Sequence, residues 1–223
     1  MTGLELLLLF FMKPILYQIR DWIKEYELKK ELEEKQRKKN VPKQCNRNIA
    51  VLGMKSAGKT RLHCALRNVD YINLETSVER YPAYTYRKSN GTYVHIQEGF
   101  DIGGGNNFRS KYVPMIKEAD IVFFLFDLFQ YRRNEEYRKE TRSRLEFITR
   151  KCKDWNHTLV TLITHKDLFT PDELSKYLAE YKNEISSTST SSTPYADAVT
   201  KYKFYPINTK DKKDINKIID SVL

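Results

Sequence analysis

Hydrophobic positions after Pro42 follow two rhythms that alternate along the chain. Short, nearly continuous apolar runs such as DIVFFLFDL at 120–128 and TLVTLIT at 158–164 are typical of strands that are buried on both faces of a parallel sheet. Apolar residues spaced three or four apart indicate helices that cover such a sheet. The pattern predicts strands over 48–52, 120–128, 158–164 and 203–207, and helices over 60–67, 133–155, 171–185 and 212–222. This alternation predicts an α/β fold with a mostly parallel sheet.

Two segments depart from the alternation. Residues 83–88 and 92–100 alternate apolar and polar side chains on either side of Asn90-Gly91, a pair that favours a tight hairpin turn. Residues 186–193 (SSTSTSST) have the composition of a flexible loop. We therefore expect one antiparallel hairpin beside the parallel sheet and one loop before the last strand.

The first 19 residues form an apolar segment that Glu5, Lys13 and Pro14 interrupt. As a helix, residues 3–19 would reach about 25 Å, which is marginal for a bilayer core of roughly 30 Å. No basic residue precedes the apolar run and no small-residue cleavage site follows it, so the segment does not resemble a signal peptide. Either it anchors the chain in a membrane, with the following basic residues on the cytoplasmic side, or it packs on a partner protein or on the chain's own domain.

Residues 20–42 are strongly charged, with acidic side chains placed four residues before basic ones, as in Glu31 and Lys35. Such pairs favour an exposed helix, and too few large apolar residues are present there to build a core. We interpret this region as a helical stalk that Pro42 ends. The sequence therefore predicts three parts: the apolar segment 1–19, the stalk 20–42 and one globular domain over 43–223.

The chain of 223 residues has a formal net charge of +10, from 39 Lys and Arg against 29 Asp and Glu. This excess favours an acidic partner, such as a nucleotide, RNA or an anionic membrane surface. The aromatic residues are scattered rather than arranged as base-stacking platforms, so no specific nucleic acid is expected. The basic residues within 133–155, Arg144 among them, are expected to form a solvated face. The three cysteines have no zinc-site spacing, which indicates reduced thiols in the cytoplasm.

The strongest chemical signal is the string GMKSAGKT at 53–60, which fits G-x-x-x-x-G-K-[ST], the P-loop pattern, between a predicted strand and a predicted helix. The two glycines let the backbone wrap around a phosphate, with its N–H groups at the start of a helix. Lys59 should reach the β and γ phosphates, and the Thr60 hydroxyl should coordinate Mg²⁺. The predicted phosphate-binding residues are Gly53, Lys55, Ser56, Ala57, Gly58, Lys59, Thr60 and Arg61.

A P-loop by itself does not separate GTPases from ATPases or small-molecule kinases. Two later strings narrow the choice: FDIGG at 100–104 and THKD at 164–167, each at the end of a predicted strand. With these strings in this order, residues 46–223 resemble the Ras-like small GTPases, and most of all the Arf family and the β subunit of the signal recognition particle receptor. The resemblance implies a six-stranded sheet with one antiparallel edge strand, helices on both faces, and a Mg²⁺-GTP site across the strand tips.

The resemblance also assigns roles outside the P-loop. It implies that Asp101 holds Mg²⁺ through water and that the Gly104 N–H contacts the γ phosphate. A loop threonine would supply the metal with a second hydroxyl, for which Thr76 is the candidate and Ser77 the reserve. The residues expected at the guanine base are the variant motif Thr164, His165, Lys166 and Asp167, and the later loop at Asn208 and Thr209.

Three positions of this site depart from the family pattern or decide its specificity. Asp167 would accept two hydrogen bonds from guanine, a pairing that adenine cannot supply, whereas His165 replaces the lysine that usually lies over the base. Gly105 stands where relatives carry the glutamine that orients the attacking water. Glycine has no side chain for this task, so we expect slow hydrolysis, assisted by a partner or by Lys55. The catalytic candidates are Lys59, Lys55 and Gly105.

These observations predict a slow GTPase that binds GTP or GDP with Mg²⁺ and acts as a nucleotide-state switch for a partner protein at a membrane. Two other functions stay open. The chain could hold GTP permanently as a structural subunit that anchors a partner, because Gly105 lacks the water-orienting group. It could also be a P-loop ATPase or kinase, because the base-reading string is imperfect. The expected location is the cytoplasm, on the cytoplasmic face of a membrane if residues 1–19 insert.

Overall fold

A computed structural model describes residues 27, 45–71, 78–102, 109–187 and 202–223. The chain divides into two compact units, Met1–Lys43 and Gln44–Leu223. In the first unit only Glu27 is described, and it is helical and exposed, so the predicted apolar segment and stalk lie otherwise outside the described residues. None of the described helices has the length and apolar character needed to cross a bilayer. The strands and helices described below all belong to the second unit.

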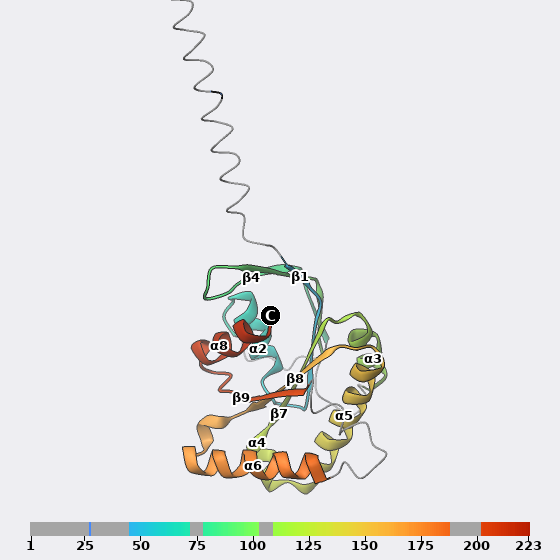
Figure 1. Ribbon diagram of the computed structural model, residues 1–223, viewed down its shortest axis with the longest axis vertical. Coiled ribbons are helices and arrows are strands. Elements are labelled where there is room, and N and C mark those ends of the chain that lie inside the picture. The colour runs from blue at the N-terminus through green and yellow to red at the C-terminus, as the bar shows by residue number, and fades with distance from the viewer. Residues whose placement is uncertain (1–26, 28–44, 72–77, 103–108, 188–201) are drawn as a thin grey trace, which may run out of the picture. The chain divides into compact units, whose positions relative to one another are not determined.

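A parallel sheet of four strands forms the centre of this unit, in the order β2-β7-β8-β9 (Figure 1). Every residue of β2 and β7 is buried, as their apolar sequences require. This sheet confirms the parallel α/β arrangement that the apolar runs predict. Its strands are β2 (Ile49–Gly53), β7 (Ile121–Asp127), β8 (Thr158–Thr164) and β9 (Tyr202–Pro206).

Two smaller sheets contain the antiparallel pairs. The predicted hairpin around Asn90-Gly91 is present, because β4 (Tyr84–Arg87) pairs antiparallel with β5 (Tyr93–Ile96) and Gly91 adopts a left-handed conformation with φ 83°. On its other side β5 pairs in parallel with β1 (Cys45–Arg47). The third sheet joins β3 (Val78–Tyr81) and β6 (Gly99–Ile102) in antiparallel register.

The single six-stranded sheet that we expected is not what the described strands form, since their hydrogen bonds define three separate sheets. Local chemistry explains two of the interruptions. Asn48, between β1 and β2, donates its backbone N–H to the Asp120 carboxylate at 2.8 Å instead of to a neighbouring strand. Pro82, between β3 and β4, has no N–H to donate.

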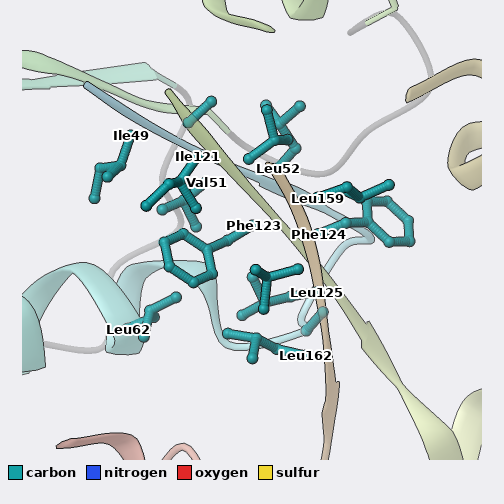
Figure 2. Close-up of a cluster of buried hydrophobic side chains, with 14 of the residues drawn as sticks. Ile49, Val51, Leu52, Leu62, Ile121, Phe123, Phe124, Leu125, Leu159 and Leu162 are labelled. Carbon is teal, nitrogen blue, oxygen red and sulfur yellow. The ribbon is translucent and has the colours of Figure 1, made fainter. Parts of the chain in front are cut away.

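Helices cover both faces of the central sheet (Figure 1). On one side lie α2 (Lys59–Arg67) and α8 (Lys212–Val222), and on the other α3 (Arg109–Glu118) and α5 (Glu135–Asp154). Figure 2 shows the matching alternation along β7, with Phe123 directed towards Leu62 of α2 and Phe124 towards the opposite side. Both phenylalanines are fully buried. The sheet is therefore a shared hydrophobic centre for the two helical layers.

The helices differ from the sequence prediction in three places. The expected helix over 133–155 is present as α5, but a short helix that the pattern did not predict, α4 (Leu128–Arg133), precedes it. Asn134 separates the two helices, and its side chain accepts the Tyr137 N–H and caps α5. The pattern did not predict α3, which contains Pro114. Helix α6 (Pro171–Ser187) includes the first two residues of the expected serine-rich loop, and the rest of that loop lies outside the described residues.

Candidate functional site

The P-loop string lies where β2 ends and α2 begins, at the carboxyl edge of the parallel sheet. Its first residue, Gly53, has φ 149°, and a Cβ there would lie 2.2 Å from the Leu125 carbonyl oxygen. The next residue, Met54, donates its N–H to the same carbonyl at 2.9 Å. The loop therefore starts pressed against the neighbouring strand β7, where only glycine fits.

Lys59 extends across the loop rather than into solvent. Its side chain is buried, and Nζ donates to the Met54 carbonyl at 2.8 Å and lies 3.4 Å from the Gly53 carbonyl. Burial lowers the pKa of Lys59 to about 8, while the nearby Asp101 carboxylate opposes that shift. Lys59 therefore still carries its proton at neutral pH, and its ammonium group is fixed beside the P-loop backbone.

The other P-loop side chains differ in exposure. Lys55 and Ser56 are exposed at the loop's tip, and Ser56 has a positive φ of 60°. Ala57 is fully buried. The Arg61 guanidinium lies 4.0 Å from the centre of the Tyr71 ring, which gives this predicted phosphate-binding residue an aromatic neighbour. The tip thus keeps polar groups open to a ligand while the rest of the loop packs into the core.

Asp101, at the end of β6, is the most unusual polar residue of this region. It is buried, and both carboxylate oxygens lack a hydrogen-bond partner among the described residues. Its charge acts on Lys59 and His63 of α2. A buried carboxylate without hydrogen bonds is costly unless a ligand completes its shell.

This donor set fits Mg²⁺. Asp101 offers carboxylate oxygens and Thr60 a hydroxyl, which are the hard ligands that Mg²⁺ prefers. No group of three or more His, Cys, Asp or Glu side chains that could hold a metal occurs in the described part of the chain. Mg²⁺ commonly takes one or two protein ligands together with phosphate oxygens, so a sparse protein set agrees with it. Thr76, the other expected ligand, lies outside the described residues, as do Gly104 and Gly105.

Thr164 and His165, the first two residues of the expected base-reading motif, contact residues of the neighbouring strand β7. Thr164 is buried, and its hydroxyl donates to the Phe126 carbonyl at 3.0 Å. The ring nitrogen Nδ1 of His165 lies 3.1 Å from that hydroxyl and 3.4 Å from a carboxylate oxygen of Asp127. His165 also has a left-handed backbone, with φ 62°. These contacts hold the imidazole at the strand end where the motif was expected.

The second half of the motif meets the later loop. Nζ of Lys166 donates to one carboxylate oxygen of Asp214 at 2.6 Å, and the Asn208 N–H donates to the other at 2.7 Å. The Asp167 carboxylate lies 3.6 Å from Nζ of Lys210. The loops after β8 and β9 are therefore brought together.

Thr209 connects this region to the P-loop. Its side chain is buried against Gly58, where an added Cβ would lie 2.9 Å from the Thr209 hydroxyl oxygen. Gly58 has φ 85° and directly precedes α2. The phosphate-binding string and the expected base-binding loops therefore share one packed surface.

Sequence reasoning missed a buried network beneath the P-loop. The Tyr112 hydroxyl of α3 donates to the Gly53 carbonyl at 3.2 Å, and Nη1 of Arg144 donates to the Tyr112 oxygen at 3.1 Å. Arg144 also bonds Glu140 one turn earlier in α5. The expectation that Arg144 belongs to a solvated face is wrong, because its side chain is only 3% exposed. Nothing in the helical charge pattern distinguishes it from its exposed neighbours.

Comparisons with known proteins identify the fold. Neither the known family models nor the curated protein sequences match this chain. Among solved structures, the chain matches one from the mammalian signal recognition particle receptor, with a TM-score of 0.59 and 17% identity over 79% of this chain and 100% of that chain. At this identity the likeness establishes only that the chain shares its α/β fold with that structure.

Proposed function

We propose that this chain binds guanine nucleotides with Mg²⁺, hydrolyses GTP slowly, and serves as a nucleotide-state switch for a partner protein at a membrane. The observation that carries the proposal is the buried pair of Lys59 and Asp101 at a complete P-loop, within a Ras-like fold. Lys59 supplies a fixed cation for phosphate, and Asp101 supplies carboxylate oxygens that no described side chain satisfies.

Different residues of the chain would bind the phosphates, the Mg²⁺ ion and the base. The backbone N–H groups of 55–60 and the Lys59 ammonium would hold the phosphates, as the start of a helix favours anions. Thr60 and Asp101 would hold Mg²⁺, which neutralises phosphate charge when bound. Asp167 would accept hydrogen bonds from the guanine ring, with His165 beside the base.

Slow turnover is part of the proposal because Gly105 has no side chain to orient water. Lys55, exposed at the P-loop tip, is the residue of this chain that we assign to assist the γ phosphate. Single-turnover hydrolysis by the purified chain tests this step. Rapid hydrolysis that Lys55→Ala leaves unchanged would contradict both the slow turnover and the role of Lys55.

A second candidate function is a subunit that holds GTP permanently and anchors a partner. The same missing side chain at Gly105 supports it, because a protein that never hydrolyses GTP needs no such group. The nucleotide that co-purifies with the chain separates the two functions. GTP that does not exchange with added GDP would favour the subunit, whereas an exchangeable mixture favours the switch.

Competition between nucleotides tests the choice of base, including the alternative that the chain is an ATPase or kinase. We expect GTP and GDP, but not ATP, to displace a fluorescent guanine nucleotide. Asp167→Asn should shift preference towards xanthine nucleotides, because an amide can donate to the xanthine carbonyl where the carboxylate accepted from guanine. Lys59→Ala should abolish binding of every nucleotide. Displacement by ATP as effective as by GTP would reject the guanine assignment.

A further inference from the structure

Asp214 lies in the first turn of α8, outside every motif, yet both of its carboxylate oxygens are used in the expected base site. One accepts from Nζ of Lys166 at 2.6 Å and the other from the backbone N–H of Asn208 at 2.7 Å. The Asp214 side chain is 16% exposed and the Lys166 side chain 30%. A carboxylate with two charge-assisted or backbone partners in a partly buried site forms strong, directional contacts.

We propose that Asp214 is a positioning residue that ties the two base-binding loops together and thereby sets the affinity and selectivity for guanine. The proposal rests on the proposed function, since it assumes that these loops read a base. Lys166 belongs to the short helix η2 (Lys166–Leu168) after β8, and Asn208 follows β9. The carboxylate therefore spans two segments that follow neighbouring strands, where the Ile207 N–H before Asn208 also donates to the Ile163 carbonyl of β8 at 2.8 Å.

The two tied positions and the residues next to them all belong to the loops expected at the base. Asp167 follows Lys166, and Thr209 follows Asn208. A hydrogen bond to a base is effective only within a narrow distance range, so the separation of the two loops decides whether both can contact one ring. By fixing Lys166 and the Asn208 N–H on a single carboxylate, Asp214 fixes that separation.

A second contact between these loops is weaker. Nζ of Lys210 lies 3.6 Å from the Asp167 carboxylate, and the Lys210 side chain is 58% exposed. Exposed pairs of this kind contribute little because water and salt screen them. Guanine itself would also compete for the Asp167 carboxylate. The Asp214 contacts use Nζ of Lys166 and the Asn208 N–H, so they do not involve the Asp167 carboxylate for which guanine would compete.

The same helix turn offers a matched control. The Asp211 carboxylate accepts the Lys213 N–H at 2.9 Å and caps α8, which is a contact within the helix start rather than between loops. Asp211→Asn removes one negative charge three residues from Asp214 and keeps a side chain that caps helices well. Any effect of charge alone near the site would appear in both variants.

The test uses the full chain and measures the dissociation rate of fluorescent GDP, followed by competition with GDP and with inosine diphosphate, which lacks guanine's amino group. We expect Asp214→Asn to accelerate GDP dissociation at least about tenfold, as loss of a charged hydrogen bond implies. We expect its preference for GDP over inosine diphosphate to fall, because a displaced Asp167 no longer reads the amino group. Asp211→Asn should keep both values.

Lys166→Gln removes the other partner of the tie and gives an independent check if Asp214→Asn folds poorly. It should reproduce the loss of selectivity, and the double variant should add little further, because one contact is lost in each case. Unchanged selectivity in Asp214→Asn or in Lys166→Gln, with wild-type chain that binds GDP, would overturn the positioning role alone. A wild-type chain that binds no guanine nucleotide would overturn the proposed function as well.

Discussion

At the scale of single residues, two glycines with nearly equal φ angles differ in the space around them. Gly58 and Gly91 have φ 85° and 83°, in the left-handed region that side chains rarely adopt. They differ in their surroundings, because a Cβ at Gly58 would meet Thr209 at 2.9 Å, whereas one at Gly91 would meet nothing within 4 Å. A side chain at either position would strain the backbone, but only at Gly58 of the P-loop would it also collide with a neighbour.

We expect Gly58→Ala to be more damaging than Gly91→Ala. Both variants should lose about 1 kcal/mol of unfolding free energy from the left-handed backbone. Only Gly58→Ala should lose more, and only it should weaken nucleotide binding, because its new methyl group must displace Thr209. Urea denaturation and a nucleotide titration of both variants provide the measurement. Equal losses in the two variants would show that the packing of Thr209 on Gly58 is unimportant.

The buried side chain of His63 makes the free energy of unfolding depend on pH. The imidazole is fully buried in α2, both ring nitrogens lack a hydrogen-bond partner among the described residues, and the ring lies 4.7 Å from that of Tyr81. Burial lowers the pKa of His63 to about 4, against an ordinary value of 6.5, although the Asp101 charge opposes the shift. The unfolded chain therefore takes up a proton at this residue before the folded chain does.

Because the unfolded chain takes up the proton first, lowering the pH should destabilise the folded chain. As the pH falls below 6.5, the native state should lose on the order of 1 kcal/mol of unfolding free energy per pH unit, until His63 itself protonates near pH 4. His63→Leu should lack this loss, because its side chain does not titrate. Denaturation midpoints of both proteins between pH 7.5 and 5.5 test the prediction. Parallel decreases in the two proteins would assign the acid sensitivity to other groups.

At the scale of elements, the P-loop is held from below by two helices. Tyr112 of α3 donates to the Gly53 carbonyl, which Lys59 also approaches, and Arg144 of α5 donates to Tyr112. Helix α3 begins at Arg109, directly after the segment that contains Gly104 and Gly105. A displacement of α3 would therefore be transmitted to the first carbonyl of the P-loop through a single hydroxyl.

A double-mutant cycle measures this link. Tyr112→Phe and Arg144→Met should each destabilise the chain by about 1 to 3 kcal/mol, since each leaves a buried polar group without its partner. The two losses should not add, with a coupling energy of about 1 kcal/mol, because the residues share one contact. Tyr86→Phe serves as control, since the Tyr86 hydroxyl bonds Asp220 in a separate network. Tyr86→Phe combined with Arg144→Met should give additive losses. Additive losses for Tyr112→Phe combined with Arg144→Met would contradict the link from Arg144 through Tyr112 to the P-loop.

At the scale of the whole molecule, the second unit contains every contact described for the candidate site. Residues 44–223 include the central sheet, both helical layers and the P-loop. We therefore expect a chain that lacks residues 1–43 to unfold in one cooperative transition and to be stabilised by GDP with Mg²⁺ as much as the full chain is. Thermal unfolding with and without the nucleotide tests this. Loss of the nucleotide effect in the shortened chain would place part of the site in the first unit.

The net charge of +10 and the apolar segment 1–19 lead to a separate expectation for the full chain. It should sediment with vesicles that contain anionic lipids, because an apolar segment followed by basic residues favours such surfaces. A chain without residues 1–19 should remain in the supernatant. Equal sedimentation of both chains would favour the alternative, in which the segment packs on a protein.

Several features of this protein follow from residues that are neighbours along the chain. The fully apolar runs gave the parallel strands, Asn90-Gly91 gave the hairpin turn, and the string at 53–60 gave the P-loop in its strand-to-helix context. Each of these follows from local periodicity or from backbone conformations that a few residue types favour. The same locality explains why the last helix, 212–222, agrees with the structure at both ends.

Other residues join the site through contacts between segments that are distant in the sequence. Arg144 looks like its exposed neighbours until α5 packs against Tyr112, and Tyr112 meets Gly53 across 59 residues of chain. Asp120 interrupts the expected sheet by capturing the N–H of Asn48 across 72 residues. Asp214 similarly meets Lys166 through folding alone. Burial and hydrogen bonding across such separations depend on how the layers pack, which no periodicity along the chain encodes.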